Sequence, residues 1–102
     1  MARLVVLYNK PADANAFDEH YFKTHVPLAK AIPGLRSYEV TKGGVGTPQG
    51  PSPYHLVAIL SFDSPAAIAA AFASKEGQAT AADLGKFAQA GAQLLICDTQ
   101  QV

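Results

Sequence analysis

The sequence predicts an α+β fold of the ferredoxin-like type, in which helices cover one face of a four-stranded antiparallel sheet. Three observations support this prediction: short runs rich in branched and aromatic residues, helical stripes between them, and the order in which the two alternate. That order is strand, helix, strand, then strand, helix, strand again (βαββαβ). At 102 residues the chain is long enough for one core and too short for two, so one domain over residues 1–102 is expected.

The first half of the chain is predicted to form a strand, a helix and a second strand. Residues 3–9 (RLVVLYN) are branched and aromatic, and a turn-like segment follows them. A helix then begins at a cap provided by Asp13 or Asn15 and ends at Pro33-Gly34. Residues 35–42 form the second strand. The apolar stripe of the helix consists of Phe17, Tyr21, His25, Leu28 and Ile32.

Pro27 lies two residues after His25, inside this predicted helix. Proline has no backbone N–H, so it cannot bond the carbonyl of Lys23 and is expected to kink or end the regular helix. Val26 precedes the proline and is expected to leave helical geometry. The bend would turn His25 further toward the sheet.

A glycine- and proline-rich segment separates the two halves. Residues 43–53 contain four glycines and three prolines, which is typical of a surface hairpin connection. The segment lacks the Gly-Lys-Ser/Thr ending of a phosphate-binding loop. The remaining predicted elements are a strand at 54–62, a helix at 63–72 capped by Asp63 or Ser64, a break at 74–77, a shorter helix at 78–90 and a strand at 92–98.

The third strand predicts self-association. One of its faces carries an entirely apolar row, and a ferredoxin-like sheet has one face without helices. We expect this row to face a second copy of the sheet, giving a two-fold homodimer joined through the sheet faces. Hydrophobic residues make up 49% of the chain and charged residues only 16%, which favours such coverage. The row consists of Tyr54, Leu56, Ala58, Leu60 and Phe62.

Composition argues against several classes of protein. Eight basic and eight acidic residues cancel without a basic cluster, which argues against binding to nucleic acid. The N-terminal apolar run is too short to cross a membrane. The single cysteine, Cys97, excludes an internal disulfide and fits a cytoplasmic protein, and its apolar neighbours predict that it is buried.

His25, His55 and Tyr38 are the candidate catalytic residues. His25 lies on the apolar stripe, and His55 lies opposite the apolar row, on the face expected to look toward the helices. Two imidazoles and a phenol suit proton transfer next to a carbonyl, lactone or enol. The alternatives are structural: His25 could bond a carbonyl freed by Pro27, and His55 could cap a strand end. The candidate pocket walls, or core residues, are Tyr8, Tyr21, Phe22 and Phe62.

No metal or cofactor site is predicted. His20 lies off the apolar stripe, and no carboxylate stands at ligand spacing from the histidines. Asp83 is expected to organise the start of its local helix rather than to take part in chemistry.

Several segments resemble the EthD family, small proteins of the dimeric α/β-barrel superfamily. The resemblance covers nearly the whole chain and implies a ferredoxin-like protomer, a homodimer whose two sheets form a barrel, and a pocket between sheet and helices. The founding members accompany a cytochrome P450 system for ether degradation, relatives include a methylmuconolactone isomerase, and neighbouring families hold cofactor-free monooxygenases and polyketide cyclases. The matching segments are Tyr8 to Pro11, Phe17 to Tyr21, THVPLAK (24–30), IPGLRSYEV (32–40), FDSPAA (62–67) and SKEGQATAADLGKF (74–87).

The resemblance and the candidate residues together indicate a small dimeric protein of xenobiotic, aromatic or ether catabolism. We expect a cofactor-independent isomerase, cyclase or oxygenase-type enzyme acting on a small hydrophobic ligand. The alternatives are a non-enzymatic binding or carrier protein for hydrophobic compounds that accompanies an oxygenase system, and a structural dimer without a deep pocket. The isomerase branch is thought to use histidine, tyrosine and a cysteine, and Cys97 is the only cysteine here.

Overall fold

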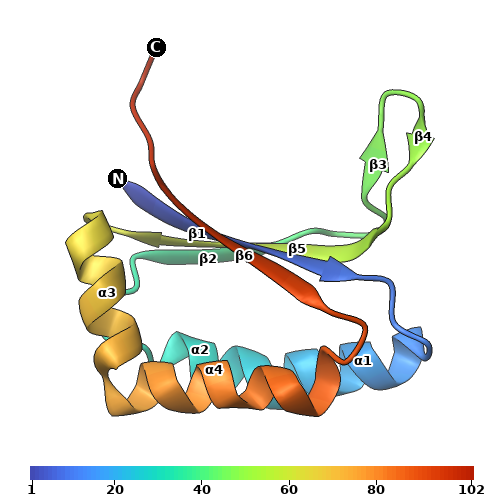
Figure 1. Ribbon diagram of the computed structural model, residues 1–102, viewed down its shortest axis with the longest axis horizontal. Helices are drawn as coiled ribbons and strands as arrows, with labels where there is room; N and C mark the ends of the chain where they lie inside the picture. The colour runs from blue at the N-terminus through green and yellow to red at the C-terminus, as the bar shows by residue number, and fades with distance from the viewer.

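Four antiparallel strands form the main sheet in the order β2-β5-β1-β6, and every helix packs against the same face of it (Figure 1). The computed structural model describes residues 1–102. The order is the ferredoxin-like one and confirms the predicted α+β fold, and the strand at 54–62 has the predicted bounds. The strands are β1 (Ala2–Asn9), β2 (Ser37–Val40), β5 (Tyr54–Phe62) and β6 (Ala92–Asp98).

The first predicted helix is continuous, but it contains a wide turn. It consists of α1 (Ala14–His20), the π-helical η1 (Tyr21–His25) and α2 (Val26–Lys30). Val26 is helical (φ −58°, ψ −46°), so the expectation that it leaves helical geometry is wrong. The chain accommodates Pro27 by widening the preceding turn, in which the Val26 N–H donates to the carbonyl of Tyr21.

The π-helical turn shifts the buried stripe by one residue. Ala29 is buried in α2, whereas the predicted Leu28 is only half-buried. A π turn holds about one residue more than an α turn, so positions beyond it rotate relative to those before it. The cap at the other end is as predicted, because the carboxylate of Asp13 accepts a hydrogen bond from the Ala16 N–H at 3.0 Å.

Two helices, α3 (Pro65–Ala73) and α4 (Lys75–Phe87), follow β5 and meet at a tight corner. The expected break near 74–77 is present at Ser74, whose backbone is extended (φ −71°, ψ 162°), but it is shorter than predicted because α4 begins at Lys75. The Ser74 hydroxyl caps α4 by accepting from the Gly77 N–H at 3.0 Å. A Cβ at Gly77 would overlap the Ala71 carbonyl oxygen, so the glycine permits close approach of the two helices. None of the helices combines the length and apolar character needed to cross a bilayer.

The apolar row of β5 lies in the core beneath the helices. Leu56, Ala58, Leu60 and Phe62 are buried together with the neighbouring row of β1. The prediction that this row faces a partner sheet is therefore wrong. Alternation along a strand groups residues by face, but it does not tell which face the helices cover.

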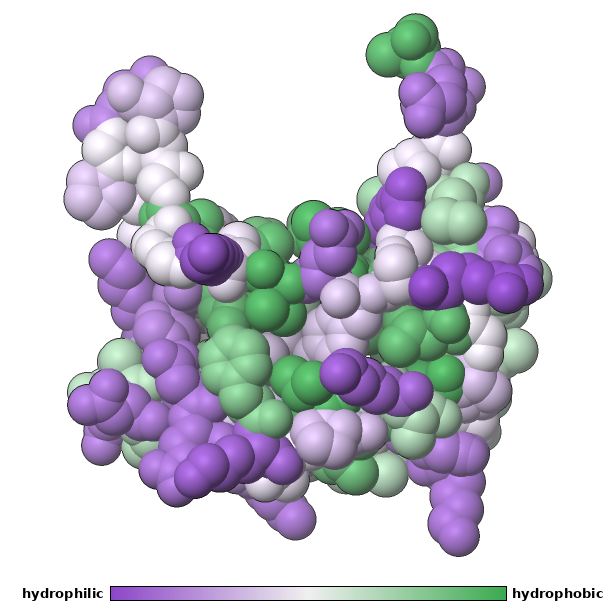
Figure 2. All heavy atoms as spheres, turned by 180° about the vertical axis from the view of Figure 1, so that it is seen from behind, coloured by the Kyte–Doolittle hydropathy of each residue, from purple (hydrophilic) through white to green (hydrophobic).

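The opposite face of the sheet has no helices and carries exposed apolar residues. Ile59 is 36% and Leu95 50% exposed there. Cys97 is exposed, contrary to prediction, because it pairs with Arg3 on this face of the edge strand β6. A small hairpin, β3 (Gly46–Thr47) and β4 (Gly50–Pro51), and the C-terminal segment project from opposite ends of this side (Figure 1). Figure 2 shows the hollow between these projections, with hydrophobic residues along its floor.

Candidate functional site

A small apolar pocket lies between the sheet and the helices. Its volume is about 70 Å³, and twelve of its fourteen lining residues are hydrophobic. The polar groups that reach it come from four elements: β1, η1, β2 and α4. They belong to Tyr8, Tyr21, His25, Tyr38 and Thr80. The pocket thus combines an apolar wall with a few hydrogen-bonding groups, the usual composition of a small-molecule site.

His25 is buried at the end of η1 and is held in one orientation by Asp83. Its Nδ1 lies 2.9 Å from Oδ2 of Asp83, and its ring packs against Phe87 with the centroids 4.7 Å apart. No protein group bonds its Nε2, and the residue lines the pocket. Burial lowers the pKa of His25, although the hydrogen bond to Asp83 opposes this effect. His25 is therefore a neutral imidazole whose Nδ1–H donates to the carboxylate, leaving Nε2 as a base.

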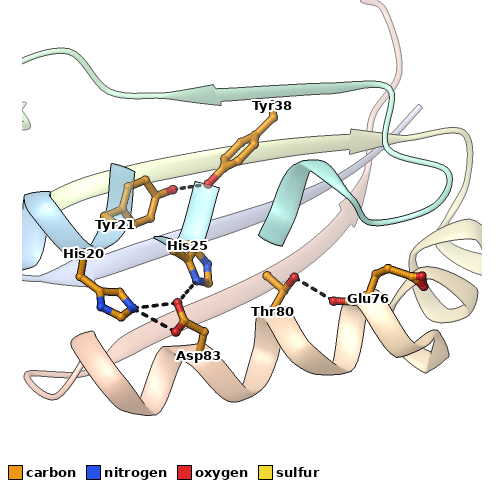
Figure 3. A network of polar contacts seen from close by, with 7 residues as sticks. All are labelled: His20, Tyr21, His25, Tyr38, Glu76, Thr80 and Asp83. Atoms are coloured by element: carbon orange, nitrogen blue, oxygen red, sulfur yellow. Dashed lines mark hydrogen bonds and ion pairs between the residues drawn. The ribbon is translucent and has the colours of Figure 1, made fainter. Parts of the chain in front are cut away.

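Asp83 is the buried anion of the site. It also accepts from Nε2 of His20, which lies 3.0 Å from both carboxylate oxygens (Figure 3). Burial alone would raise the pKa of Asp83, but the hydrogen bonds from His20 and His25 outweigh it and hold the pKa below its ordinary value. The carboxylate therefore stays ionised.

Sequence reasoning missed the role of Asp83 and His20. The signal was present in α4, whose buried residues are Gly77, Thr80, Asp83 and Phe87, at helical spacing. An acidic residue on the core-facing stripe of a helix needs a buried partner.

Three tyrosines surround the pocket as hydrogen-bond donors. The hydroxyls of Tyr21 and Tyr38 are 2.6 Å apart and point toward each other (Figure 3). Burial raises the pKa of Tyr21 far above its ordinary value, and it also raises the pKa values of Tyr8 and Tyr38. All three remain protonated near neutral pH. They can donate to an oxygen that gains negative charge.

His55 lies outside this pocket. Tyr8 pairs with Leu56 and Asn9 with Tyr54, so His55 is the extra residue of a β-bulge. The bulge aims its Nε2 at Oδ1 of Asp18 on α1, 2.7 Å away. His25 and Tyr38 therefore share a cavity that His55 does not line, and the predicted convergence of all three is not observed.

Of the four residues predicted to form the pocket wall or the core, two line the pocket and two lie elsewhere. Tyr8 and Tyr21 line the pocket. Phe22 is 49% exposed and lines a separate open groove with His55, and Phe62 is completely buried in the core away from the pocket. No group of three or more His, Cys, Asp or Glu side chains is arranged to hold a metal ion.

Comparison with known proteins identifies close relatives. The family profile described as the EthD domain matches residues 9–91. An 11.0 kDa protein encoded in the thcB–thcC intergenic region of Rhodococcus erythropolis is 44% identical over 102 residues, which cover 100% of this chain and 98% of that protein.

Solved structures agree with the fold. An ethyl tert-butyl ether D (EthD) family protein from Bacillus halodurans C-125 is 41% identical, with a TM-score of 0.90, covering 98% of this chain and 99% of that one. A variant of SnoaB, a cofactor-independent oxygenase from Streptomyces nogalater, is 15% identical, with a TM-score of 0.67, covering 99% of this chain and 94% of that one. The likeness to SnoaB concerns the fold alone.

Proposed function

The chain belongs to the EthD family, and from that premise we propose that it is a cofactor-independent enzyme that removes a proton from a small, largely apolar substrate. One observation carries the proposal: a buried histidine whose Nε2 bonds no protein group lines an apolar pocket, while Asp83 holds its other nitrogen. A histidine whose tautomer is fixed by a carboxylate is suited to act as a general base.

The proposed reaction begins at a C–H or O–H group made acidic by a neighbouring carbonyl or ring. Nε2 of His25 accepts the proton, and the electron pair moves onto the substrate oxygen. One hydroxyl of the Tyr21–Tyr38 pair donates to the other, and the hydroxyl that accepts in this pair is free to donate its own proton to the substrate oxygen. Asp83 stabilises the imidazolium. Return of the proton to another atom gives isomerisation, attack of the carbanion within the substrate gives cyclisation, and its reaction with O₂ gives oxygenation.

The pocket restricts the class of substrate. Its apolar wall and small volume favour an uncharged molecule with one or two carbonyl or hydroxyl groups, such as a lactone, catechol or quinone. An ether has no comparably acidic C–H group, so a role in ether or aromatic catabolism would concern a later carbonyl or phenolic product. The position of the R. erythropolis relative in the thcB–thcC intergenic region is compatible with such a role.

Deuterium exchange tests this function directly. Lactones, and catechols or quinones that carry a C–H group acidified by a carbonyl or ring, would be screened for a rise in melting temperature. Those that bind would be incubated in D₂O with the protein, and loss of substrate C–H signals would be followed by NMR. Exchange should occur with the wild type and the surface control Glu19→Gln and be lost with His25→Gln. If His25→Gln exchanged the proton as fast as the wild type, His25 would not be the base.

A binding or carrier protein is the second candidate. The predominance of hydrophobic residues in the pocket favours it, because an apolar molecule needs no acid or base to be held there. Saturable binding without proton exchange in any ligand, unchanged in His25→Gln, would support the carrier function.

We further propose that the protein forms a homodimer through the helix-free face of the sheet. Exposed Ile59 and Leu95 both pair with Val5 and lie on that face, from whose opposite ends the β3–β4 hairpin and the C-terminal segment project (Figure 1). Burial of such a self-complementary surface is the common basis of two-fold dimers. Light scattering should give twice the chain mass for the wild type and the chain mass for Ile59→Arg. A monomeric wild type at micromolar concentration would contradict the proposal.

A further inference from the structure

The carboxylate of Asp83 is shared by two histidines that differ in their access to solvent. Nε2 of His20 lies 3.0 Å from both carboxylate oxygens, and Nδ1 of His25 lies 2.9 Å from Oδ2. The His20 side chain is 28% exposed, whereas those of His25 and Asp83 are 5% and 4% exposed. Figure 3 shows the two rings on different sides of the carboxylate. The carboxylate of Asp83 therefore bonds two histidines, of which only His20 is substantially exposed to solvent.

The other titratable groups near His25 are uncharged. They are the pocket tyrosines Tyr8, Tyr21 and Tyr38, whose hydroxyls keep their protons near neutral pH. The charges that act on His25 at short range are therefore those of Asp83 and His20. In a buried site such charges interact far more strongly than they do in water.

The charged groups around His20 are solvated. Glu19 and Lys23 lie beside it on α1 and η1 and pair with each other at 3.3 Å, and both are exposed. On the other side an open groove contains Asp13 and Lys86. Water and salt screen these four charges. They screen the contact between His20 and Asp83 less, because the Asp83 side chain is buried.

We propose that His20 is a positioning residue that controls, through the shared carboxylate of Asp83, how readily His25 accepts a proton. The catalytic part of this inference depends on the function proposed above, whereas the coupling of the two rings does not.

The sign of the coupling follows from the charges. Burial is the main cause that lowers the pKa of His25, and a positive charge on the nearby ring of His20 lowers it further. The His20 imidazolium then neutralises Asp83, the group that would stabilise an imidazolium at His25. A second positive charge on the same carboxylate is unfavourable, so His25 stays neutral to a lower pH than it would beside Asp83 alone.

Two substitutions of His20 should act in opposite directions. Glutamine can still donate an N–H to Asp83 but carries no charge, so the titration midpoint of His25 should rise by about one pH unit, a tenfold change in its protonation equilibrium. Arginine is always charged, so His20→Arg should keep the midpoint at or below that of the wild type. Glu19→Gln removes a neighbouring surface charge without touching Asp83 and should change the midpoint by no more than about 0.2 units.

NMR titration of ring-labelled histidine provides the measurement, and the three histidines of the chain give few signals to assign. An upward shift in His20→Gln, absent in His20→Arg, supports the inference. Equal midpoints in the wild type and His20→Gln, or upward shifts of the same size in both variants, would overturn it, since a merely structural role does not distinguish charged from neutral replacements. This titration needs no substrate, so a shift in the absence of deuterium exchange would refute the proposed enzyme while leaving the coupling intact.

Discussion

Asp83→Asn removes the charge of the shared carboxylate while nearly preserving its shape. The two histidines now donate to an anion, at 2.9 Å and 3.0 Å. Hydrogen bonds to charged groups contribute about 1.5–3 kcal/mol and neutral ones about 0.5–1.5 kcal/mol, so each ring loses about 1 kcal/mol. We therefore expect the free energy of unfolding to fall by about 2 kcal/mol and the melting temperature by about 8–16 °C for a chain of this length.

The amide also changes which nitrogens carry protons. An asparagine side chain offers one acceptor oxygen, so His20 and His25 can no longer both donate to residue 83. At least one ring must present a bare nitrogen to the amide N–H, and ¹⁵N NMR of labelled histidine detects that change. If His25 is the ring that changes, its Nε2 becomes protonated and can no longer act as a base.

Urea denaturation and ¹⁵N NMR test both parts of this prediction. Asp18→Asn is the matched control, because Asp18 also accepts from a histidine but its side chain is 47% exposed, so its loss should cost less than about 1 kcal/mol. If Asp83→Asn cost no more than that control, the buried carboxylate would not stabilise the site as described.

Three further predictions concern the packing and ionisation of the chain. Gly77→Ala should destabilise the fold by about 1–3 kcal/mol, because its Cβ would collide with the Ala71 carbonyl. Gly85→Ala should stabilise the fold by about 0.5–1 kcal/mol, because nothing lies within 4 Å of the added Cβ. If urea denaturation ranked the two variants the other way, the close approach of α3 and α4 would be refuted. Tyr21→Phe removes the 2.6 Å hydroxyl contact and should cost about 1 kcal/mol in the same assay, so unchanged stability would mean that the contact adds nothing. Because the folded-state pKa of His25 is lowered, the folded protein binds fewer protons than the unfolded chain. The free energy of unfolding should therefore fall as the pH drops below about 6.5. Denaturation curves measured at a series of pH values should show this decrease, and His25→Gln should reduce it.

Local sequence patterns predicted the helices and strands of this fold. The predictions failed where contacts between residues distant in the sequence determine the structure. The bounds of β5 follow from a continuous branched and apolar run between turn residues. The prediction of which face of β5 the helices cover was wrong, because that depends on where the helices pack and not on the strand sequence. The predicted break extended to Gly77, but the break is confined to Ser74, and the glycine instead permits close contact with the Ala71 carbonyl of the preceding helix. Such contacts leave no signature in a window of neighbouring residues.

The candidate site was predictable only in part, because some of its contacts join residues that are distant in the sequence. His25 stands on a helical stripe that can be read directly from its spacing. Its essential neighbour Asp83 is 58 residues away in the chain, and only the packing of α4 beside η1 brings them together. The position of His55 depends on a β-bulge, and nothing in the strand pattern indicates where a bulge will form.

The wide turn η1 determines which residue of α2 lines the pocket. Because the turn holds one extra residue, Ala29 rather than Leu28 lines the cavity, and the wall carries a methyl group where an isobutyl group would otherwise stand. A deletion of either exposed residue Lys23 or Thr24 would restore a regular turn, bring Leu28 inward and fill the space. The space that this protein offers to a ligand therefore depends on the number of residues in one helical turn as well as on the residues of the wall.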